Sequence, residues 1–124
     1  MKLELSWPEP ALWPNERAHW KPVSRARRGQ RHEARMATLE QMAGRAYVWD
    51  GGTVRLTITG HKPRENGQDR TNFEAALKAA LDGVADAIAV NDKYFVVATD
   101  WGDNWPPRAA RPWTGLWCCA ILDL

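Results

Sequence analysis

The sequence predicts a small α/β (α+β) domain in which about four strands form a mixed sheet and two main helices pack against it. Segments with alternating apolar residues lie near the beginning and in the middle of the chain, and a stripe with helical spacing follows the second of them. The final segment is almost continuously apolar. The chain has 124 residues, 44% of them hydrophobic, which suits one compact domain over residues 1–124.

The chain is expected to begin with a short strand. Leu3 and Leu5 alternate with charged residues, as in a strand with one buried face. From Trp7 to about Pro22, four prolines and three tryptophans predict an ordered loop without regular structure. We expect most loop tryptophans to pin these loops onto the core, although exposed ones can stack on unpaired bases.

A basic helix is expected next. Ser24 is a suitable N-cap, the helix body should run from about Gln30 to Ala43, and Gly44 lies just past its end. The residues expected to point inward are Met36, Leu39 and Ala43.

The middle of the chain predicts a strand, a polar loop and a second helix. Alternation of Val54, Leu56 and Ile58 with polar residues indicates a strand with one buried face. Residues 60–68 form the polar loop. The second helix carries an apolar stripe at spacings of four and three, formed by Phe73, Leu77, Leu81, Val84 and Ile88.

Two more strands complete the expected sheet, over residues 94–98 and 116–124. The last is nearly all apolar, as expected at the centre of a sheet or at an interface. The adjacent Cys118 and Cys119 are expected to be free thiols in a reducing cytoplasm, because neighbouring strand side chains point to opposite faces. No apolar run approaches the roughly 20 residues that span a bilayer, and Met1 leads into a strand rather than a signal peptide.

Polar residues around the second helix are the candidates for chemistry. Asp69 and Asn72 open this helix, Lys78 and Asp82 follow one turn apart, and Asp92 begins the next strand. Carboxylates around a helix N-terminus suit Mg²⁺, which prefers hard oxygen ligands. A nearby lysine can neutralise charge that develops on a phosphate.

A structural explanation of the same residues stays open. Thr71 and Glu74 have the spacing of a capping box, which is a common way to begin a helix. Lys78 and Asp82 can pair with each other, which stabilises a helix by only about 0.2–0.5 kcal/mol.

Positive charge is clustered, although the net charge is only +2. Clustered arginine and lysine side chains neutralise phosphates and give salt-sensitive nucleic-acid binding, whereas the alternative is a solvated helix face. Acidic residues dominate later, from Asp82 to Asp103. The residues expected to contact DNA are Asn15, Arg17, Lys21, Arg25, Arg27, Arg28, Arg31, Lys62, Arg64 and Arg70.

The central run resembles the motif of the RusA family of Holliday-junction resolvases, found mainly in phages and prophages. That family carries Asp-x-Asp-Asn at the start of a helix, then a Lys, an Asp four residues later and an Asp-Asp pair before the next strand. The matching positions, in order, are Asp69, Asn72, Lys78, Asp82 and Asp92. Two positions depart from the pattern, because Thr71 replaces the second Asp and Asn91 replaces the first Asp of the pair. The Trp7-Pro8 and Trp13-Pro14-Asn15 segments also resemble the family's N-terminal Pro-rich loop.

The resemblance implies a Mg²⁺-dependent endodeoxyribonuclease, with Mn²⁺ as a substitute, that resolves four-way DNA junctions in recombination, repair or phage DNA processing. It implies that Asp69, Lys78 and Asp92 are catalytic. Asp69 and Asp92 would bind the metal, with Thr71, Asn72 and Asp82 as further candidates. Because Thr71 removes one negative charge, we expect weakened metal affinity.

The length of the second helix constrains this site. If residues 72–88 formed one straight helix, its ends would lie about 25 Å apart, and Asp69 and Asp92 of one chain could not share an ion. Either the helix breaks at Gly83, or Asp92 of a second subunit completes the site. Because a four-way junction is two-fold symmetric, we expect a homodimer, with sites shared between the subunits as the leading arrangement. Two alternatives stay open: a junction-binding protein with weakened catalysis, and a small basic binding domain without nuclease activity.

Overall fold

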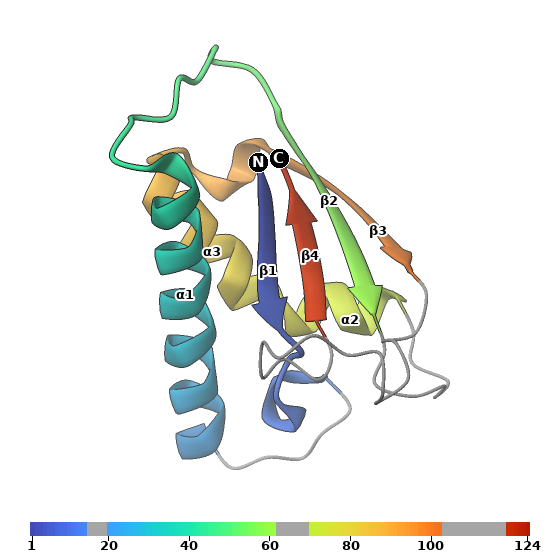
Figure 1. The fold of residues 1–124 in the computed structure, drawn as a ribbon. Coiled ribbons are helices and arrows are strands. Elements are labelled where there is room, and N and C mark those ends of the chain that lie inside the picture. Colours follow the sequence, from blue (N-terminus) through green and yellow to red (C-terminus); the bar gives the residue numbers. More distant parts are fainter. Residues whose placement is uncertain (15–19, 62–69, 103–118) are drawn as a thin grey trace, which may run out of the picture.

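The structure, a computed structural model, describes residues 1–14, 20–61, 70–102 and 119–124 (Figure 1). These residues form a small mixed α/β fold, as the sequence predicts. The strands are β1 (Lys2–Ser6), β2 (Val54–His61), β3 (Phe95–Trp101) and β4 (Cys119–Asp123). The helices are α1 (Trp20–Met42), α2 (Arg70–Ala76) and α3 (Lys78–Ile88), with short 3₁₀ turns η1 (Pro10–Leu12) and η2 (Asp92–Tyr94).

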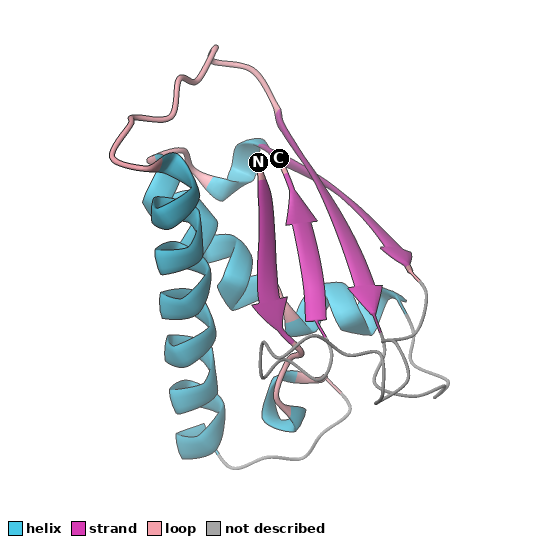
Figure 2. Cartoon of the chain, viewed as in Figure 1, coloured by secondary structure: helices cyan, strands magenta, loops and turns pink. Residues whose placement is uncertain are grey.

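The four strands form one mixed sheet in the order β1-β4-β2-β3 (Figure 2). Strand β4 pairs antiparallel with both β1 and β2, whereas β2 and β3 are parallel. A parallel pair needs a crossover connection, and α2 and α3 form it across one face of the sheet. Helix α1 stands beside β1, and both chain ends meet at one end of the sheet.

The strand predictions are largely confirmed. Leu3, Leu5, Val54, Leu56 and Ile58 are all buried, while their neighbours in β1 and β2 point outward. The apolar C-terminal strand is central, as expected, over the described part, Cys119–Asp123. The side chain of Cys119 and all of Cys118 lie outside the described residues, so the prediction of free thiols stays a prediction.

Two strand boundaries were predicted wrongly. Gly60 and His61 belong to β2 rather than to the polar loop. The phenyl and indole rings of Phe73 and Trp101 would lie within 2.8 Å of a Cβ at position 60, so this glycine lets aromatic side chains pack directly on the strand. Strand β3 begins at Phe95 and continues to Trp101, beyond the expected end at Ala98, because it pairs with β2 along that whole length.

The start of the basic helix was also predicted wrongly. Helix α1 begins at Trp20, so Ser24 lies within the helix and is not its N-cap. Pro22 lies in the first turn, where its missing N–H and fixed φ are tolerated. The expected end is close to the observed one, since Ala43 and Gly44 follow with positive φ values of 50° and 79°.

The inward face of α1 differs from the expectation. Met36 is 49% exposed and Leu39 is 36% exposed. The buried residues are instead Ala26, Ala34 and Thr38, which are smaller and spaced by multiples of four. Small side chains are needed here because α3 crosses α1 closely.

Gly83 is the point of that crossing. A Cβ at position 83 would overlap the carbonyl oxygen of Arg31 and lie 3.0 Å from the backbone nitrogen of Arg35. Gly83 is therefore in the interior of α3, packed against the backbone of α1. Of the two alternatives drawn from the sequence, the helix break at Gly83 is wrong, because this glycine lies within α3 and provides room for a neighbouring helix.

The predicted second helix is divided at Leu77. Helix α2 ends at Ala76, Leu77 has φ −100° and ψ 7°, and α3 begins at Lys78. The expected apolar stripe is nevertheless confirmed, because its five residues are all buried against the sheet or α1. The straight helix over residues 72–88, from which a shared site was argued, does not form.

Aromatic residues of three segments cluster beside the sheet. The rings of Trp7 and Phe73 stack with centroids 5.1 Å apart, and Trp13 and Trp101 lie within 6.0 Å of Phe73. Trp7 and Trp13 thus pin the N-terminal loop onto the core, as predicted, whereas Trp101 lies in β3 and not in a loop. Among the described helices, none has the length and apolar character to cross a membrane.

Candidate functional site

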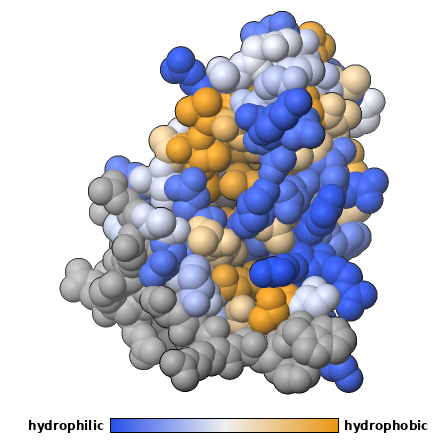
Figure 3. All heavy atoms as spheres, turned by 180° about the vertical axis from the view of Figure 1, so that it is seen from behind, coloured by the Kyte–Doolittle hydropathy of each residue, from blue (hydrophilic) through white to orange (hydrophobic). Residues whose placement is uncertain are grey.

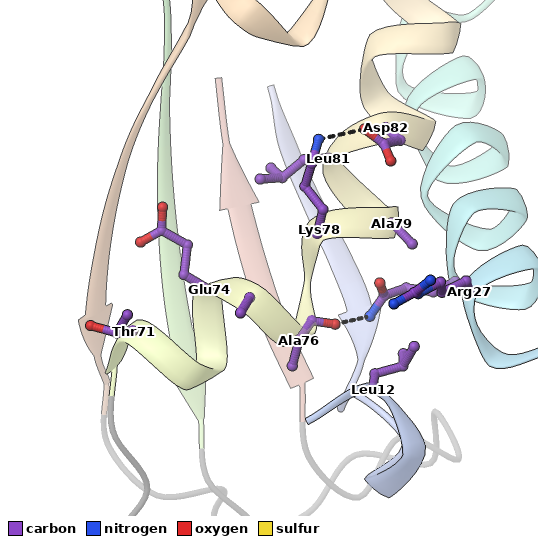
Figure 4. Close-up of a pocket in the computed structure, with 11 residues that line it drawn as sticks. Leu12, Arg27, Thr71, Glu74, Ala76, Lys78, Ala79, Leu81 and Asp82 are labelled. Atoms are coloured by element: carbon purple, nitrogen blue, oxygen red, sulfur yellow. Dashed lines mark hydrogen bonds and ion pairs between the residues drawn. The ribbon is translucent and has the colours of Figure 1, made fainter. Parts of the chain in front are cut away.

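Lys78 lies at the centre of the candidate site. Its ammonium group donates to a carboxylate oxygen of Asp82 at 2.8 Å (Figure 4), and it also forms an ion pair with Asp92. Lys78 and Asp82 are one turn apart on α3, as the sequence predicts, whereas Asp92 begins η2. The structure therefore brings three of the predicted site residues together within one chain.

The break at Leu77 explains how Lys78 is placed. Because α3 starts directly after the break, Lys78 is its first residue and its side chain extends along α3 to the level of Asp82 (Figure 4). After α3, Ala89 adopts a left-handed conformation, with φ 58°, that ends the helix and turns the chain back. This turn brings Asp92 to the same ammonium group.

The charges of the site stabilise one another. The hydrogen bond with Asp82 is the main cause that raises the pKa of Lys78 above its ordinary value, followed by the hydrogen bond with Asp92. The hydrogen bond from Lys78 in turn lowers the pKa of Asp92. Lys78 is therefore a fixed cation near neutral pH, and Asp92 is a fixed anion.

A long surface groove runs through this cluster. Three adjoining hollows all include Asp82 in their walls. One hollow of about 770 Å³ extends from Asp82 past Lys78 to Thr71 at the beginning of α2, and another extends to Asp92. Arg27 on α1 forms the opposite wall (Figure 4).

The arginines of α1 provide the positive side of the groove. Arg27 and Arg28 line it and are exposed, with no hydrogen bond or ion pair to another described residue. Figure 3 shows hydrophilic side chains gathered along the edge that α1 forms on this side of the molecule. Lys21 and Arg25 are exposed on the same helix.

Arg31 has a different environment from the other arginines. Its guanidinium donates two hydrogen bonds to the carboxylate of Asp86, at 2.7 and 2.9 Å, and this joins α1 to α3. The hydrogen bond with Asp86 raises the pKa of Arg31 and lowers that of Asp86. Arg31 was predicted to contact DNA, but in the structure its guanidinium already forms an ion pair that links two helices.

Several predicted site residues lie outside the described residues. These are Asp69, Asn15, Arg17, Lys62, Arg64 and the side chain of Arg70. Within the part of the chain that the structure describes, no group of three or more carboxylate, histidine or cysteine side chains is close enough to hold a metal ion. The described carboxylates at the centre of the site are Asp82 and Asp92, and both contact Lys78.

The two positions that depart from the resolvase pattern have structural surroundings of their own. Thr71 lies in the first turn of α2 rather than at its N-cap, and the carboxylate of Glu74 accepts from the hydroxyl of Thr99 in β3. Thr71 and Asn72 lie at the opposite end of α2 from Lys78. The side chain of Asn91 accepts from the backbone N–H of Lys93 and caps η2.

Sequence reasoning missed one polar residue near the site. Gln30 of α1 contacts the backbone of both Ala76 and Ala80, on either side of Lys78. In the sequence, Gln30 lies at the same four-residue spacing as Ala26, Ala34 and Thr38. This spacing identifies Gln30 as an inward-facing residue only once the structure shows that the row of small residues is the buried face of α1.

Comparison with known proteins identifies an uncharacterized relative of this chain. No protein-family model matches the chain. The chain is 37% identical, over 100 residues, to an uncharacterized protein from Xylella fastidiosa (strain Temecula1 / ATCC 700964). The match covers 76% of this chain and 61% of the relative, so the chain spans less than two thirds of that protein's length.

Proposed function

We propose that this protein is a Mg²⁺-dependent endonuclease that cleaves branched DNA, with the four-way junction as its preferred substrate. The observation that carries the proposal is the ammonium of Lys78 held by Asp82 and Asp92 in a groove walled by arginine. A cation fixed beside carboxylates, opposite a wall of arginines, suits a phosphodiester, whose charge grows during hydrolysis.

The resemblance to RusA resolvases supports the same assignment. Lys78, Asp82 and Asp92 are three of the positions that match the family motif, and they meet in space although Asp92 belongs to a different element. Helix capping alone would require no such meeting. We therefore also propose a RusA-like fold.

The donor groups present fit a magnesium ion. Asp82 and Asp92 are partly exposed and offer hard oxygen atoms, which Mg²⁺ prefers, and two carboxylates are sufficient for many such sites. These residues, together with Asp69, would hold the ion. When bound, Mg²⁺ supplies Lewis acidity and lowers the pKa of a coordinated water.

The chain's own residues have separate roles in this proposal. Lys78 neutralises a non-bridging phosphate oxygen, and its raised pKa keeps it protonated, so it acts as an electrostatic stabiliser and not as a base. Asp92 stays ionised because its pKa is lowered, which suits cation binding rather than proton donation. Arg27 and Arg28 hold the flanking DNA backbone by contacts to phosphates.

Assembly and location are part of the proposal. A homodimer in the cytoplasm, bacterial or phage-encoded, would present two equivalent sites to the two-fold symmetric junction. Because Lys78, Asp82 and Asp92 meet within one chain, each subunit supplies these three residues of its own site.

A second candidate function has an observation in its favour. Asn91 caps its own turn, in a position where the resolvase pattern has a carboxylate. With Thr71 also uncharged, the site has fewer anionic ligands for a metal. The second candidate is therefore a protein that binds branched DNA and cleaves it weakly or not at all.

The test is incubation of the purified protein with a labelled four-way junction, with and without Mg²⁺. The nuclease proposal requires paired symmetric nicks that depend on Mg²⁺ and disappear in Asp92→Asn. A matched control is Glu40→Gln, which removes one exposed carboxylate on α1, away from the groove. A retarded but intact junction would support the binding protein. If the junction were neither nicked nor retarded, the remaining alternative would be a small basic binding domain that has no nuclease activity.

A further inference from the structure

We infer that Gln30 is a positioning residue that keeps α2 and α3 apart and thereby sets where α2 lies relative to Lys78 in the groove. The role of Lys78 in catalysis rests on the proposed function, but the placement of α2 by Gln30 does not. Gln30 lies on α1, whereas the residues it contacts lie 46 and 50 positions later in the chain.

Two hydrogen bonds define the arrangement. The side-chain NH₂ of Gln30 donates to the carbonyl oxygen of Ala76 at 2.9 Å. The side-chain oxygen of Gln30 accepts from the backbone N–H of Ala80 at 3.0 Å. Figure 4 shows the first of these bonds at the end of α2. The side-chain amide of Gln30 thus donates to one backbone group and accepts from another only four residues later in the chain.

These two backbone groups would bond to each other in a continuous helix. In an α-helix the N–H of residue 80 donates to the carbonyl of residue 76, four positions earlier. Here the amide of Gln30 stands between them and satisfies both. Insertion of a side chain into this ladder of hydrogen bonds is a recognised cause of sharp helix kinks.

The first turn of α3 has no local replacement for Gln30. Leu77 is the N-cap residue and forms no side-chain capping bond. An N-cap side chain ordinarily accepts from the second or third N–H of the helix, and Ala80 is the third residue of α3. Ala76 and Ala80 are also buried, at 1% and 0% exposed, so water cannot readily take the place of the glutamine.

Lys78 lies midway between the two residues that Gln30 holds. If Gln30 were removed, the N–H of Ala80 and the carbonyl of Ala76 could bond directly, and α2 and α3 could join into one helix. The direction of α2 relative to Lys78 would then change, whereas Lys78 would keep its pair with Asp82, which lies four residues later on the same helix. A misplacement of about 1 Å can lower a reaction rate about a hundredfold.

The test compares wild type with Gln30→Ala, which removes the inserted amide, and with Gln30→Glu, which keeps only the acceptor for Ala80. The control is Gln41→Ala, at an exposed position of the same helix. The readouts on the 124-residue chain, without DNA, are the ¹³Cα shift of Leu77 and the amide ¹H shift of Ala80, whose N–H bonds Gln30. With a junction and Mg²⁺, kcat and the junction Kd are measured separately.

In Gln30→Ala we expect the Leu77 shift to move toward the helical value and the Ala80 amide shift to change, because its N–H loses the Gln30 acceptor. We expect kcat to fall by about tenfold to a hundredfold while Kd stays within about twofold, because phosphate contacts are retained. Gln30→Glu should lie between wild type and Gln30→Ala.

Two other outcomes separate this inference from the proposed function. If both NMR signals of Gln30→Ala match those of Gln41→Ala, Gln30 does not keep α2 and α3 apart and the inference is overturned. If the signals move as expected but the wild-type protein nicks no junction, the positioning role is supported and the nuclease proposal fails.

Discussion

The close crossing of α1 and α3 predicts that two Gly→Ala substitutions change the stability of the protein in opposite directions. Gly83 and Gly29 both lie inside helices. A Cβ at Gly29 would meet no atom within 4 Å, whereas a Cβ at Gly83 would overlap the carbonyl oxygen of Arg31 and lie 3.1 Å from the Cβ of Ala34. The same chemical change should therefore stabilise the protein at one site and destabilise it at the other.

The size of each effect follows from two terms. Alanine is more favourable than glycine in a helix interior by about 0.8–1.0 kcal/mol. Gly29→Ala has only this term and should raise the free energy of unfolding by about 1 kcal/mol. Overpacking typically costs 1–3 kcal/mol, and the upper end applies to Gly83→Ala because a backbone carbonyl cannot rotate away. The net effect there is a loss of about 2 kcal/mol, or a fall in Tm of roughly 6–12 °C for a domain of this size.

Urea and thermal unfolding, followed by tryptophan fluorescence and circular dichroism, measure both variants against wild type. The slope of the free energy with urea should stay constant, since a changed slope would indicate an altered denatured state rather than altered packing. If Gly83→Ala were as stable as Gly29→Ala, the two helices would not be in backbone contact, and the account of the buried face of α1 would be refuted.

Three further predictions concern the charges of the protein. First, the lowered pKa of Asp86 means that its ion pair stabilises the fold fully above the ordinary carboxyl pKa of 3.8 and loses this effect as pH falls through the lower folded value. The difference in unfolding free energy between wild type and Asp86→Asn should therefore be constant above about pH 5 and shrink as the pH falls through 3.8 and below, and a difference that stays constant over that lower range would contradict it. Second, log affinity for a four-way junction should fall linearly with log salt, by about 0.9 per neutralised phosphate. The double variant Arg27→Ala/Arg28→Ala should flatten this slope, and an unchanged slope would remove these two residues from the DNA contact. Third, mixed dimers of Lys78→Met and Asp92→Asn subunits should not recover nicking, because both residues act in the same chain's site. Recovery on mixing would show that sites are shared between subunits.

Local sequence pattern was sufficient for much of the fold. The alternation in β1 and β2, the apolar stripe of the α2–α3 segment and the central position of β4 were all predicted. Each depends on the period of a strand or helix, which neighbouring residues reveal on their own. Lys78 and Asp82 were likewise found by their spacing of four on one helix face.

The buried face of α1 could not be predicted from hydropathy. Met36 and Leu39 are more hydrophobic than Thr38, yet Thr38 is buried at 0% exposed and bonds the carbonyl of Ala34 at 2.7 Å. The reason is the partner helix. Because the backbone of α3 approaches at Gly83, only small side chains fit between the helices, and the larger ones are turned outward.

The sequence by itself determined the helix and strand periods, the small size of the domain and the supply of carboxylates and basic residues around the second helix. Only the tertiary structure decided where that helix breaks and which charges meet. Gln30 reaches the break at Leu77 from another helix, and Asp92 reaches Lys78 after a left-handed turn at Ala89. Hydrogen bonds and ion pairs act through space over a few ångströms, so residues distant in sequence can set the geometry of a site that local periodicity leaves undefined.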